Sequence, residues 1–264
     1  METNKNQRLV IKVGTSTLTH KTGRLNIRRV EQIVKVIADI KNSGREVILV
    51  SSGSIGLGMG KLGLLKRPDD TPTKQACAAV GQCELMYMYD KLFGEYNQVV
   101  AQLLLTKYVL LEGRRTNVEN ATRKLLEKGV IPIVNENDTV AIDELELEMG
   151  ENDSLAATVA DIAKADMLII LSDIDGLFDK NPNTSKDAKL INRVYEITDD
   201  LKNAAGGSGS SLGSGGMITK LNAAEIAMNS GIDMAIINGK EPDLLYDLLE
   251  GKAVGTLFKA RKGD

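Results

Sequence analysis

The feature that most constrains the fold is a regular alternation of short apolar runs with longer segments of helical periodicity. The apolar runs resemble buried strands and fall at residues 8–13, 46–50, 99–105, 130–134, 167–171, 233–237 and 254–258. The segments between them carry apolar residues three or four positions apart and predict helices at residues 26–43, 74–93, 112–128, 152–164, 217–229 and 242–249. Strands that alternate with helices favour an α/β fold with a mostly parallel sheet.

The predicted helix 26–43 shows this pattern clearly. Its apolar residues recur at helical spacing, so we expect one inward face made of Ile27, Val30, Ile33, Val34, Ile37 and Ile40. The residues Asn42 and Ser43, followed by Gly44, are typical of a helix end.

Polar or glycine-rich turns follow four of the predicted strands. They are Gly14-Thr15-Ser16, Ser51-Ser52-Gly53-Ser54, Asn135-Glu136-Asn137-Asp138 and Ser172-Asp173. In parallel sheets, ligands bind at the carboxyl ends of the strands. One such turn would mean little, because ordinary loops are also polar, but four in one sheet indicate a single site. A weak boundary near Gly150 suggests that the earlier and later parts of the chain hold different ligands.

The tract 204–220 is mostly glycine and serine until a helical pattern begins near its end. Apolar residues then recur at helical spacing, at Ile218, Leu221, Ala224 and Met228. A glycine-rich loop that enters a helix offers free backbone N–H groups and the positive end of the helix dipole to an anion, and Lys220 lies in the first turn. Taken alone, the tract is equally compatible with a flexible linker or lid.

Lys12 lies in the middle of an apolar predicted strand, shortly before Gly14. An outward-pointing charge is one interpretation, but a strand covered by helices on both faces has little solvated surface. A lysine in that position tends to reach past the strand end toward an anion. Lys12 and Lys220 together suit phosphoryl transfer, in which charge on the transferred group must be neutralised.

Composition narrows the chemistry of the acceptor. His20 is the only histidine among 264 residues, which argues against His-based triads and zinc chemistry and favours a surface position for that residue. Transfer to a hydroxyl often needs a general base, whereas a carboxylic acid with a pKa of roughly 4 is already ionised at neutral pH. A carboxylate acceptor therefore fits this composition without being required by it.

Several other classes of protein are disfavoured. The net charge of −3 gives no electrostatic case for nucleic acid or for an anionic membrane surface. The apolar runs are too short to span a bilayer and the N-terminus lacks the apolar core of a signal peptide, so we expect a cytoplasmic protein with no membrane partner. Cys77 and Cys83 match no metal-binding pattern, and we expect both to be buried thiols.

Neither common nucleotide motif is present in its proper context. No Walker pattern occurs, because Gly60-Lys61 is followed by leucine. The glycines of a G-x-G-x-x-G pattern occur at positions 58, 60 and 63, but this pattern starts too far beyond its strand for a dinucleotide site.

Seven segments of the chain resemble the amino acid kinase family, and within it the glutamate 5-kinase branch. They are Lys12-Val-Gly-Thr-Ser16, Ser51-Ser-Gly-Ser-Ile55, Ala79-Val-Gly-Gln82, Asn135-Glu-Asn-Asp-Thr-Val140, Asn152-Asp153, Ser172-Asp173-x-x-Gly176-Leu177 and Gly213-x-Gly-Gly-Met-x-Thr-Lys220. Their order and spacing match over essentially the whole chain. The lysine and glycine-rich segments are common to the family, whereas the Val-Gly-Gln and Asn-Glu-Asn-Asp segments resemble that branch in particular.

This resemblance implies a three-layer α/β/α sandwich with a mainly parallel central sheet. It implies a single amino acid kinase domain over residues 1–264, with roughly 1–150 as the acceptor-substrate lobe and 151–264 as the nucleotide lobe. The implied reaction is ATP + L-glutamate → ADP + L-glutamate 5-phosphate, the first step of proline biosynthesis. Because the sequence stops at Asp264, soon after the last predicted strand, we expect a short form without the C-terminal PUA domain that many bacterial members carry.

The resemblance also implies roles for individual residues. Lys12 and Lys220 would hold the β- and γ-phosphates and stabilise the transition state, and Asp153 would orient the two lysines. Glutamate would be held by Ser52, Asp138 and Asn152, with the charge of Asp138 on the substrate ammonium. The nucleotide would be lined by Lys12, Ser172, Asp173, Ser214, Gly215, Gly216, Met217, Ile218, Thr219 and Lys220. Mg²⁺ would bind the phosphates, and no metal ligand is expected from the protein.

Two residues depart from the family pattern. Glu151 stands where an aspartate is common, and Ser172 replaces a common threonine while keeping the hydroxyl.

The resemblance further implies partners: L-proline as a feedback inhibitor, a homo-oligomer (dimer or tetramer), and a glutamate-5-semialdehyde dehydrogenase that uses the product. Two alternatives stay open. One is another kinase of the family, acting on N-acetylglutamate, aspartate, carbamate or a nucleotide monophosphate, although Asp138 favours a free amine. The other is a non-catalytic ligand sensor, against which Lys12, Lys220 and Asp153 argue.

The remaining features are expected to be structural. The carboxylates Asp143, Glu144, Glu146, Glu148 and Glu151 predict a solvated hairpin and not a metal site. We expect residues 86–89 to lie in the core or at a subunit contact.

Overall fold

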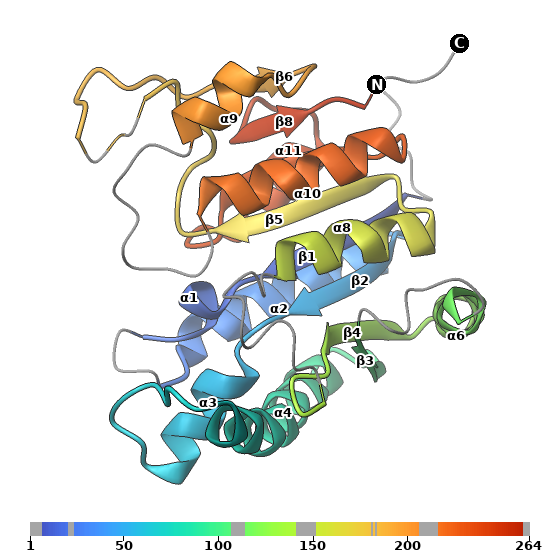
Figure 1. The fold of residues 1–264 in the computed structure, drawn as a ribbon. Coiled ribbons are helices and arrows are strands. Elements are labelled where there is room, and N and C mark those ends of the chain that lie inside the picture. The colour runs from blue at the N-terminus through green and yellow to red at the C-terminus, as the bar shows by residue number, and fades with distance from the viewer. Residues whose placement is uncertain are drawn as a thin grey trace.

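The computed structural model describes residues 7–20, 24–106, 114–140, 152–180, 182, 184–205 and 216–260. In this part of the chain, eight strands form one sheet in the order β3-β4-β2-β1-β5-β7-β8-β6. Figure 1 shows the sheet from β6 and β8 at the top to β3 at the bottom. The strands are β1 Arg8–Val13, β2 Glu46–Ser51, β3 Val100–Leu105, β4 Ile131–Glu136, β5 Met167–Ser172, β6 Arg193–Val194, β7 Asp233–Asn238 and β8 Thr256–Phe258.

The sheet is mainly parallel, as the alternation of strands and helices predicts. The strands from β3 to β7 in the spatial order run parallel to one another, β8 pairs antiparallel with β7, and β6 pairs parallel with β8. The four strands from the first half of the chain occupy one side of the sheet and the later four occupy the other. The two sides meet where β1 pairs with β5.

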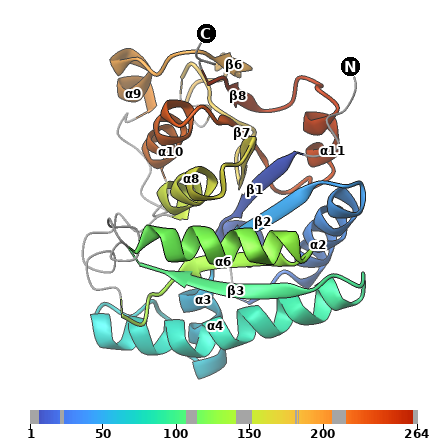
Figure 2. The ribbon, with the colours of Figure 1, turned by 90° about the vertical axis from the view of Figure 1, so that its right-hand side faces the viewer.

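Helices cover both faces of the sheet. The helices are α1 Thr15–Leu18, α2 Ile27–Asn42, α3 Ser54–Leu62, α4 Thr71–Gly94, α6 Arg115–Glu127, α8 Asn152–Ala163, α9 Asp199–Ala205, α10 Met217–Asn229 and α11 Leu244–Leu249. One core packs β-strand residues against α2, α4 and α11, and a second core packs them against α6, α8 and α10. Figure 2 shows α8 and α10 on one side of the strands and α2 and α11 on the other. The fold is the expected three-layer α/β/α sandwich.

The alternation of side chains along β1 decides where its lysine goes. Leu9, Ile11 and Val13 belong to the core under α2 and α4, whereas Val10 belongs to the core under α8 and α10. Successive side chains of a strand point to opposite faces. Lys12 therefore emerges on the side of α8 and α10.

Gly58 of the G-x-G-x-x-G pattern and Gly81 allow two helices to pack closely. A Cβ atom at Gly58 of α3 would lie 1.8 Å from the backbone oxygen of Cys77 on α4. A Cβ at Gly81 of α4 would lie 1.7 Å from the backbone oxygen of Ser54. The two helices approach closely because these positions have no side chain. Gly63, with a φ of +71°, ends α3.

Two expectations about burial are wrong. Ile27 is 60% exposed, because it is the first residue of α2 and lines a surface hollow with His20 and Arg28 instead of the core. Cys83 is exposed while Cys77 is buried. Six positions along a helix rotate a side chain well away from its starting face, so a helix that buries Cys77 turns Cys83 toward solvent.

The segment 86–89 divides between core and surface. Met88 and Tyr89 are buried, whereas Tyr87 is exposed. The acidic stretch 143–151 lies outside the described residues. Among the helices that are described, none combines the length and the apolar character that crossing a bilayer requires.

Candidate active site

The predicted site residues come together at the carboxyl ends of neighbouring strands. Lys12 lies near the end of β1, Ser52 directly follows β2, and Ser172 is the last residue of β5. Asn152 begins α8, and Lys220 lies in the first turn of α10. Because β4, β2, β1 and β5 are adjacent and parallel, their carboxyl ends share one edge of the sheet.

Asp153 is the centre of a buried charge cluster. Lys12 Nζ lies 2.7 Å from Asp153 Oδ1, and Lys220 Nζ lies 3.2 Å from Asp153 Oδ2. The Asp153 side chain is fully buried, and the two lysine side chains are less than one tenth exposed. Thr219 also donates its hydroxyl hydrogen to Oδ2, over 3.2 Å. Each carboxylate oxygen therefore faces a different lysine, and the carboxylate fixes the separation of the two ammonium groups.

The charge of this carboxylate depends on the lysines. Burial by itself acts to raise the pKa of Asp153, but attraction by Lys12 and then by Lys220 outweighs it and holds the pKa below the ordinary value of 3.8. Removing one partner of a buried ion pair typically costs about 3–5 kcal/mol. The charged states of Lys12, Asp153 and Lys220 therefore stabilise one another.

The helices explain the placement of the charges. Asp153 lies in the first turn of α8, where a carboxylate is favoured by the positive end of the helix dipole. Lys220 lies in the first turn of α10, where a cation is disfavoured, and its ion pair with Asp153 offsets that cost. Gly216, the N-cap of α10, has no side-chain cap, which suits the binding of an anion there.

A second polar cluster lies beside the first and is made of amides. Asn152 Nδ2 donates to Ser52 Oγ over 2.9 Å and to Asn135 Oδ1 over 2.8 Å. Asn135 Nδ2 in turn donates to Gln82 Oε1 over 2.9 Å. Asn152 immediately precedes Asp153, so one turn of α8 connects the charge cluster with this amide chain.

Asp138 is the carboxylate on this side of the site. It accepts a hydrogen bond from Ser54 Oγ over 2.7 Å. Burial raises the pKa of Asp138, and the hydrogen bond from Ser54 and the charge of Arg67 oppose this only in part. A half-buried carboxylate with these neighbours can bind an ammonium group.

The residues expected around a nucleotide are only partly described. Ser172 is buried, and its hydroxyl donates to Asp173 Oδ1 over 3.3 Å. Gly216 to Lys220 form the start of α10, with Thr219 in contact with Asp153. Ser214 and Gly215 lie outside the described residues.

Sequence reasoning missed three members of the site: Ser54, Gln82 and Asn135. Each lies within a segment that carries the family resemblance, but nothing in the local pattern says that their side chains contact the substrate-side residues. Only the packing of α4 and β4 brings Gln82 to Asn135.

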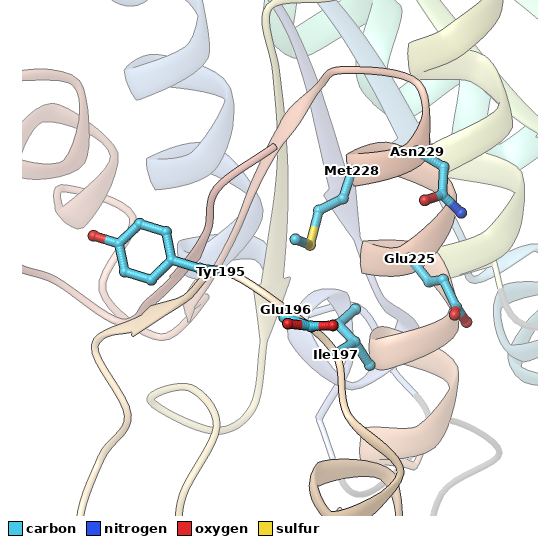
Figure 3. A pocket seen from close by; sticks show the side chains of 6 residues that line it. All are labelled: Tyr195, Glu196, Ile197, Glu225, Met228 and Asn229. Carbon is cyan, nitrogen blue, oxygen red and sulfur yellow. The ribbon is translucent and has the colours of Figure 1, made fainter. Parts of the chain in front are cut away.

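A separate pocket does not belong to this site. Its lining is Tyr195, Glu196, Ile197, Glu225, Met228 and Asn229. Figure 3 shows these side chains on α10 and on the segment that follows β6. None of them is a predicted site residue, and Met228 and Asn229 lie at the opposite end of α10 from Lys220.

Comparison with known proteins shows the family to which the chain belongs. The family model described as "Amino acid kinase family" matches residues 7–238. The chain belongs to the amino acid kinase family. It is 54% identical over 261 residues to a glutamate 5-kinase of Clostridium perfringens, an alignment that covers 98% of this chain and 97% of that protein. It is 52% identical over 259 residues to a glutamate 5-kinase of Listeria innocua, covering 97% and 94%.

Solved structures of the amino acid kinase fold are similar to the whole chain. The crystal structure of isopentenyl phosphate kinase from T. acidophilum superposes with a TM-score of 0.66 at 19% identity, covering 96% of this chain and 100% of that one. At this level of identity the similarity concerns the fold alone.

Proposed function

We propose that this chain phosphorylates the side-chain carboxylate of L-glutamate with ATP and forms ADP and L-glutamate 5-phosphate. The observation that carries the proposal is the pair of buried lysines, Lys12 and Lys220, held on the two oxygens of Asp153 beside a polar acceptor site. The high identity with glutamate 5-kinases over nearly the full length supports it.

In this reaction a carboxylate oxygen of glutamate attacks the γ-phosphorus while the bond to the oxygen of ADP breaks. The attacking carboxylate is already ionised, so no proton has to be removed and no general base is needed. Lys12 and Lys220 neutralise the charge that is shared between the phosphoryl group and the leaving oxygen. Asp153 keeps both ammonium groups in place before the substrates bind.

On the acceptor side, Asp138 binds the ammonium of glutamate, and Ser52 and Asn152 bind its polar groups. Asp138 supplies the opposite charge, which an amide would not match. This arrangement favours free glutamate over N-acetylglutamate, whose acylated amine carries no charge.

The nucleotide binds at the ends of β5 and α10, against Ser172, Asp173 and the residues from Gly216 to Lys220. Among the described residues no cluster of three or more His, Cys, Asp or Glu side chains could hold a metal. Mg²⁺ would bind with the nucleotide and would neutralise part of the charge on the phosphate oxygens. Residues 1–150 then act as the acceptor lobe and 151–264 as the nucleotide lobe.

The proposal extends to the setting of the reaction. The enzyme acts in the cytoplasm as a homo-oligomer, L-proline inhibits it by competing near the glutamate site, and a glutamate-5-semialdehyde dehydrogenase consumes the reactive acyl phosphate.

The deciding experiment measures ADP release with ATP and Mg²⁺ for glutamate, N-acetylglutamate, aspartate and uridine monophosphate, with and without hydroxylamine. We expect activity with glutamate and a trapped hydroxamate, because hydroxylamine attacks an acyl phosphate. Activity with another acceptor alone would overturn the substrate. ATP binding without turnover of any acceptor would favour a ligand sensor.

A further inference from the structure

Gln82 on α4 is a buried polar residue that the proposed mechanism leaves without a role. The residue is 8% exposed. Its Oε1 accepts a hydrogen bond from Asn135, whereas its Nε2 is buried without a hydrogen-bond partner in the described part of the chain. An amide in such a place is costly unless it is used, because a buried donor without an acceptor loses its hydration.

The amide chain that starts at Gln82 has a direction. Asn135 gives its Nδ2 to Gln82 Oε1 and therefore presents Oδ1 to Asn152. Asn152 Nδ2 donates both of its hydrogens, to Asn135 Oδ1 and to Ser52 Oγ. At the open end of the chain, no hydrogen bond within the described residues uses Asn152 Oδ1 or the hydroxyl hydrogen of Ser52. Asn152 therefore offers an acceptor there, and Ser52, which already accepts, offers a donor.

We propose that Gln82 is a positioning residue for the acceptor substrate. It sets the direction of the chain, so that Ser52 offers a donor and Asn152 offers an acceptor at the open end. An acceptor molecule with both a carboxylate and an ammonium needs both kinds of group. Without the oxygen of Gln82, the Asn135 amide can turn over, and Asn152 and Ser52 then lose their fixed polarity.

This inference rests on the proposed function, because it takes glutamate to occupy the site of Ser52, Asn152 and Asp138. It goes beyond that function by assigning a role to a residue that acts through Asn135. Since the amide chain lies on the acceptor side, the effect should appear in the Michaelis constant for glutamate and not in that for ATP.

The test compares Gln82→Met, Asn135→Ala and the double variant with the wild type. We expect Gln82→Met to raise KM for glutamate about tenfold, while KM for ATP stays within about twofold. Because Gln82 acts through Asn135, the double variant should be no worse than Asn135→Ala alone. Additive effects of the two substitutions, or equal changes in both Michaelis constants, would overturn the inference.

Gln98→Met is the matched control. Gln98 Nε2 donates to Asn42 Oδ1 over 2.9 Å, so this variant also removes a hydrogen bond between a glutamine and an asparagine, but neither residue touches the site residues. We expect both Michaelis constants to stay unchanged. A rise in KM for glutamate in this control as large as that in Gln82→Met would show that the effect is not specific to the amide chain.

Gln82→Glu tests the direction of the chain and also serves if Gln82→Met does not fold. It keeps the volume and an oxygen acceptor for Asn135, so its KM for glutamate should lie closer to the wild-type value than that of Gln82→Met. Where only Gln82→Glu folds, KM within about threefold of the wild type supports the inference. A KM at or above that of Gln82→Met, or about tenfold above the wild type when Gln82→Met does not fold, would contradict it.

Failure of the proposed function and failure of this inference give different results. If the wild type itself fails to phosphorylate glutamate, the proposed function is wrong and this inference is wrong with it. If the wild type turns over normally and Gln82→Met is unaffected, only this inference is wrong.

Discussion

At the scale of residues, one carboxylate organises the site. Asp153 takes Lys12 from β1 and Lys220 from α10, so elements from both halves of the sheet meet at its two oxygens. Its depressed pKa keeps the carboxylate ionised at neutral pH. The lysines are therefore positioned by a group that does not itself need to touch the substrates.

The first prediction concerns Lys220. Replacing Lys220 by alanine should lower kcat by about 10²–10³-fold, because it removes charge stabilisation that is strongest in the transition state. KM for glutamate should change little. Steady-state kinetics measure both, and Lys202→Ala is the control, since Lys202 of α9 pairs with Glu225 of α10 at 2.8 Å and lies outside the cluster. An unchanged kcat in Lys220→Ala would remove it from the chemistry.

The second prediction concerns pH. The pKa of Asp138 is raised by burial above its ordinary value of 3.8. As the pH falls through the raised value, Asp138 gains a proton and loses its attraction for an ammonium, so KM for glutamate should rise at a higher pH than an exposed aspartate would allow. Profiles of KM against pH for the wild type and Asp138→Asn isolate this ionisation. The variant should start with a higher KM and lack this rise; superimposable profiles would contradict the role.

Much of the charge cluster was predictable, because a lysine in an apolar strand and a lysine in a first helical turn are each unusual locally. The contact between Gln82 and Asn135 was not, because two residues 53 positions apart carry no mutual signal in a single sequence. The two residues meet because α4 packs against the sheet near β4, and a single sequence does not show that packing.

At the scale of elements, the crossing of α3 and α4 supports the acceptor side. Ser54 begins α3 and binds Asp138, and Gln82 lies on α4, so the distance between these helices affects both polar contacts. Gly58 and Gly81 permit the close approach.

The third prediction tests this crossing. Gly81→Ala places a Cβ atom 1.7 Å from the backbone oxygen of Ser54, so the helices must separate. We expect a loss of about 3 kcal/mol or more in the free energy of unfolding, together with a higher KM for glutamate. Gly94→Ala is the control on the same helix, because no heavy atom lies within 4 Å of its added Cβ. That control should be neutral or stabilise by up to about 1 kcal/mol. Denaturant unfolding measures both, and equal stabilities would contradict the packing argument.

The long periodic elements were predictable to within a few residues, and α10 matches its predicted range of 217–229. Three short elements, α1, β6 and α9, were not predicted. A strand of two residues has no periodicity to detect, and its pairing with β8 depends on residues far along the chain. Ile27 was misplaced for a related reason, since helical spacing does not reveal where the core ends.

At the scale of the whole molecule, the order of strands separates the residues proposed for the acceptor from most of those proposed for the nucleotide. Ser52, Asn135 and Asp138 lie on or just after strands from the first half of the chain. Ser172 ends β5, and Lys220 lies on α10, both from the second half. Among the elements that the structure describes, α8 alone, which begins with Asn152 and Asp153, contributes to both clusters.

The fourth prediction follows from this separation. ADP at about 100 times its Kd should stabilise the wild type by roughly 2.7 kcal/mol, seen as a rise in Tm. Ser52→Ala should keep this rise, because Ser52 lies on the acceptor side, and Lys220→Ala should reduce it. Thermal unfolding with and without ADP measures the shift. An equal loss in both variants would contradict two separate subsites.

The position of β1 has a consequence for how the protein is made. Arg8 at the start of β1 donates its backbone N–H to Asp166, which lies 158 residues later. During synthesis, β1 can pair with β2 early, but its other edge has no partner until β5 has left the ribosome. Through most of translation the nascent chain therefore exposes an open apolar strand that carries Lys12, and that lysine meets its carboxylate only once α8 has emerged. We therefore expect ribosome-bound intermediates to depend on chaperones until α8 and β5 have emerged, although β1 and β2 can pair much earlier.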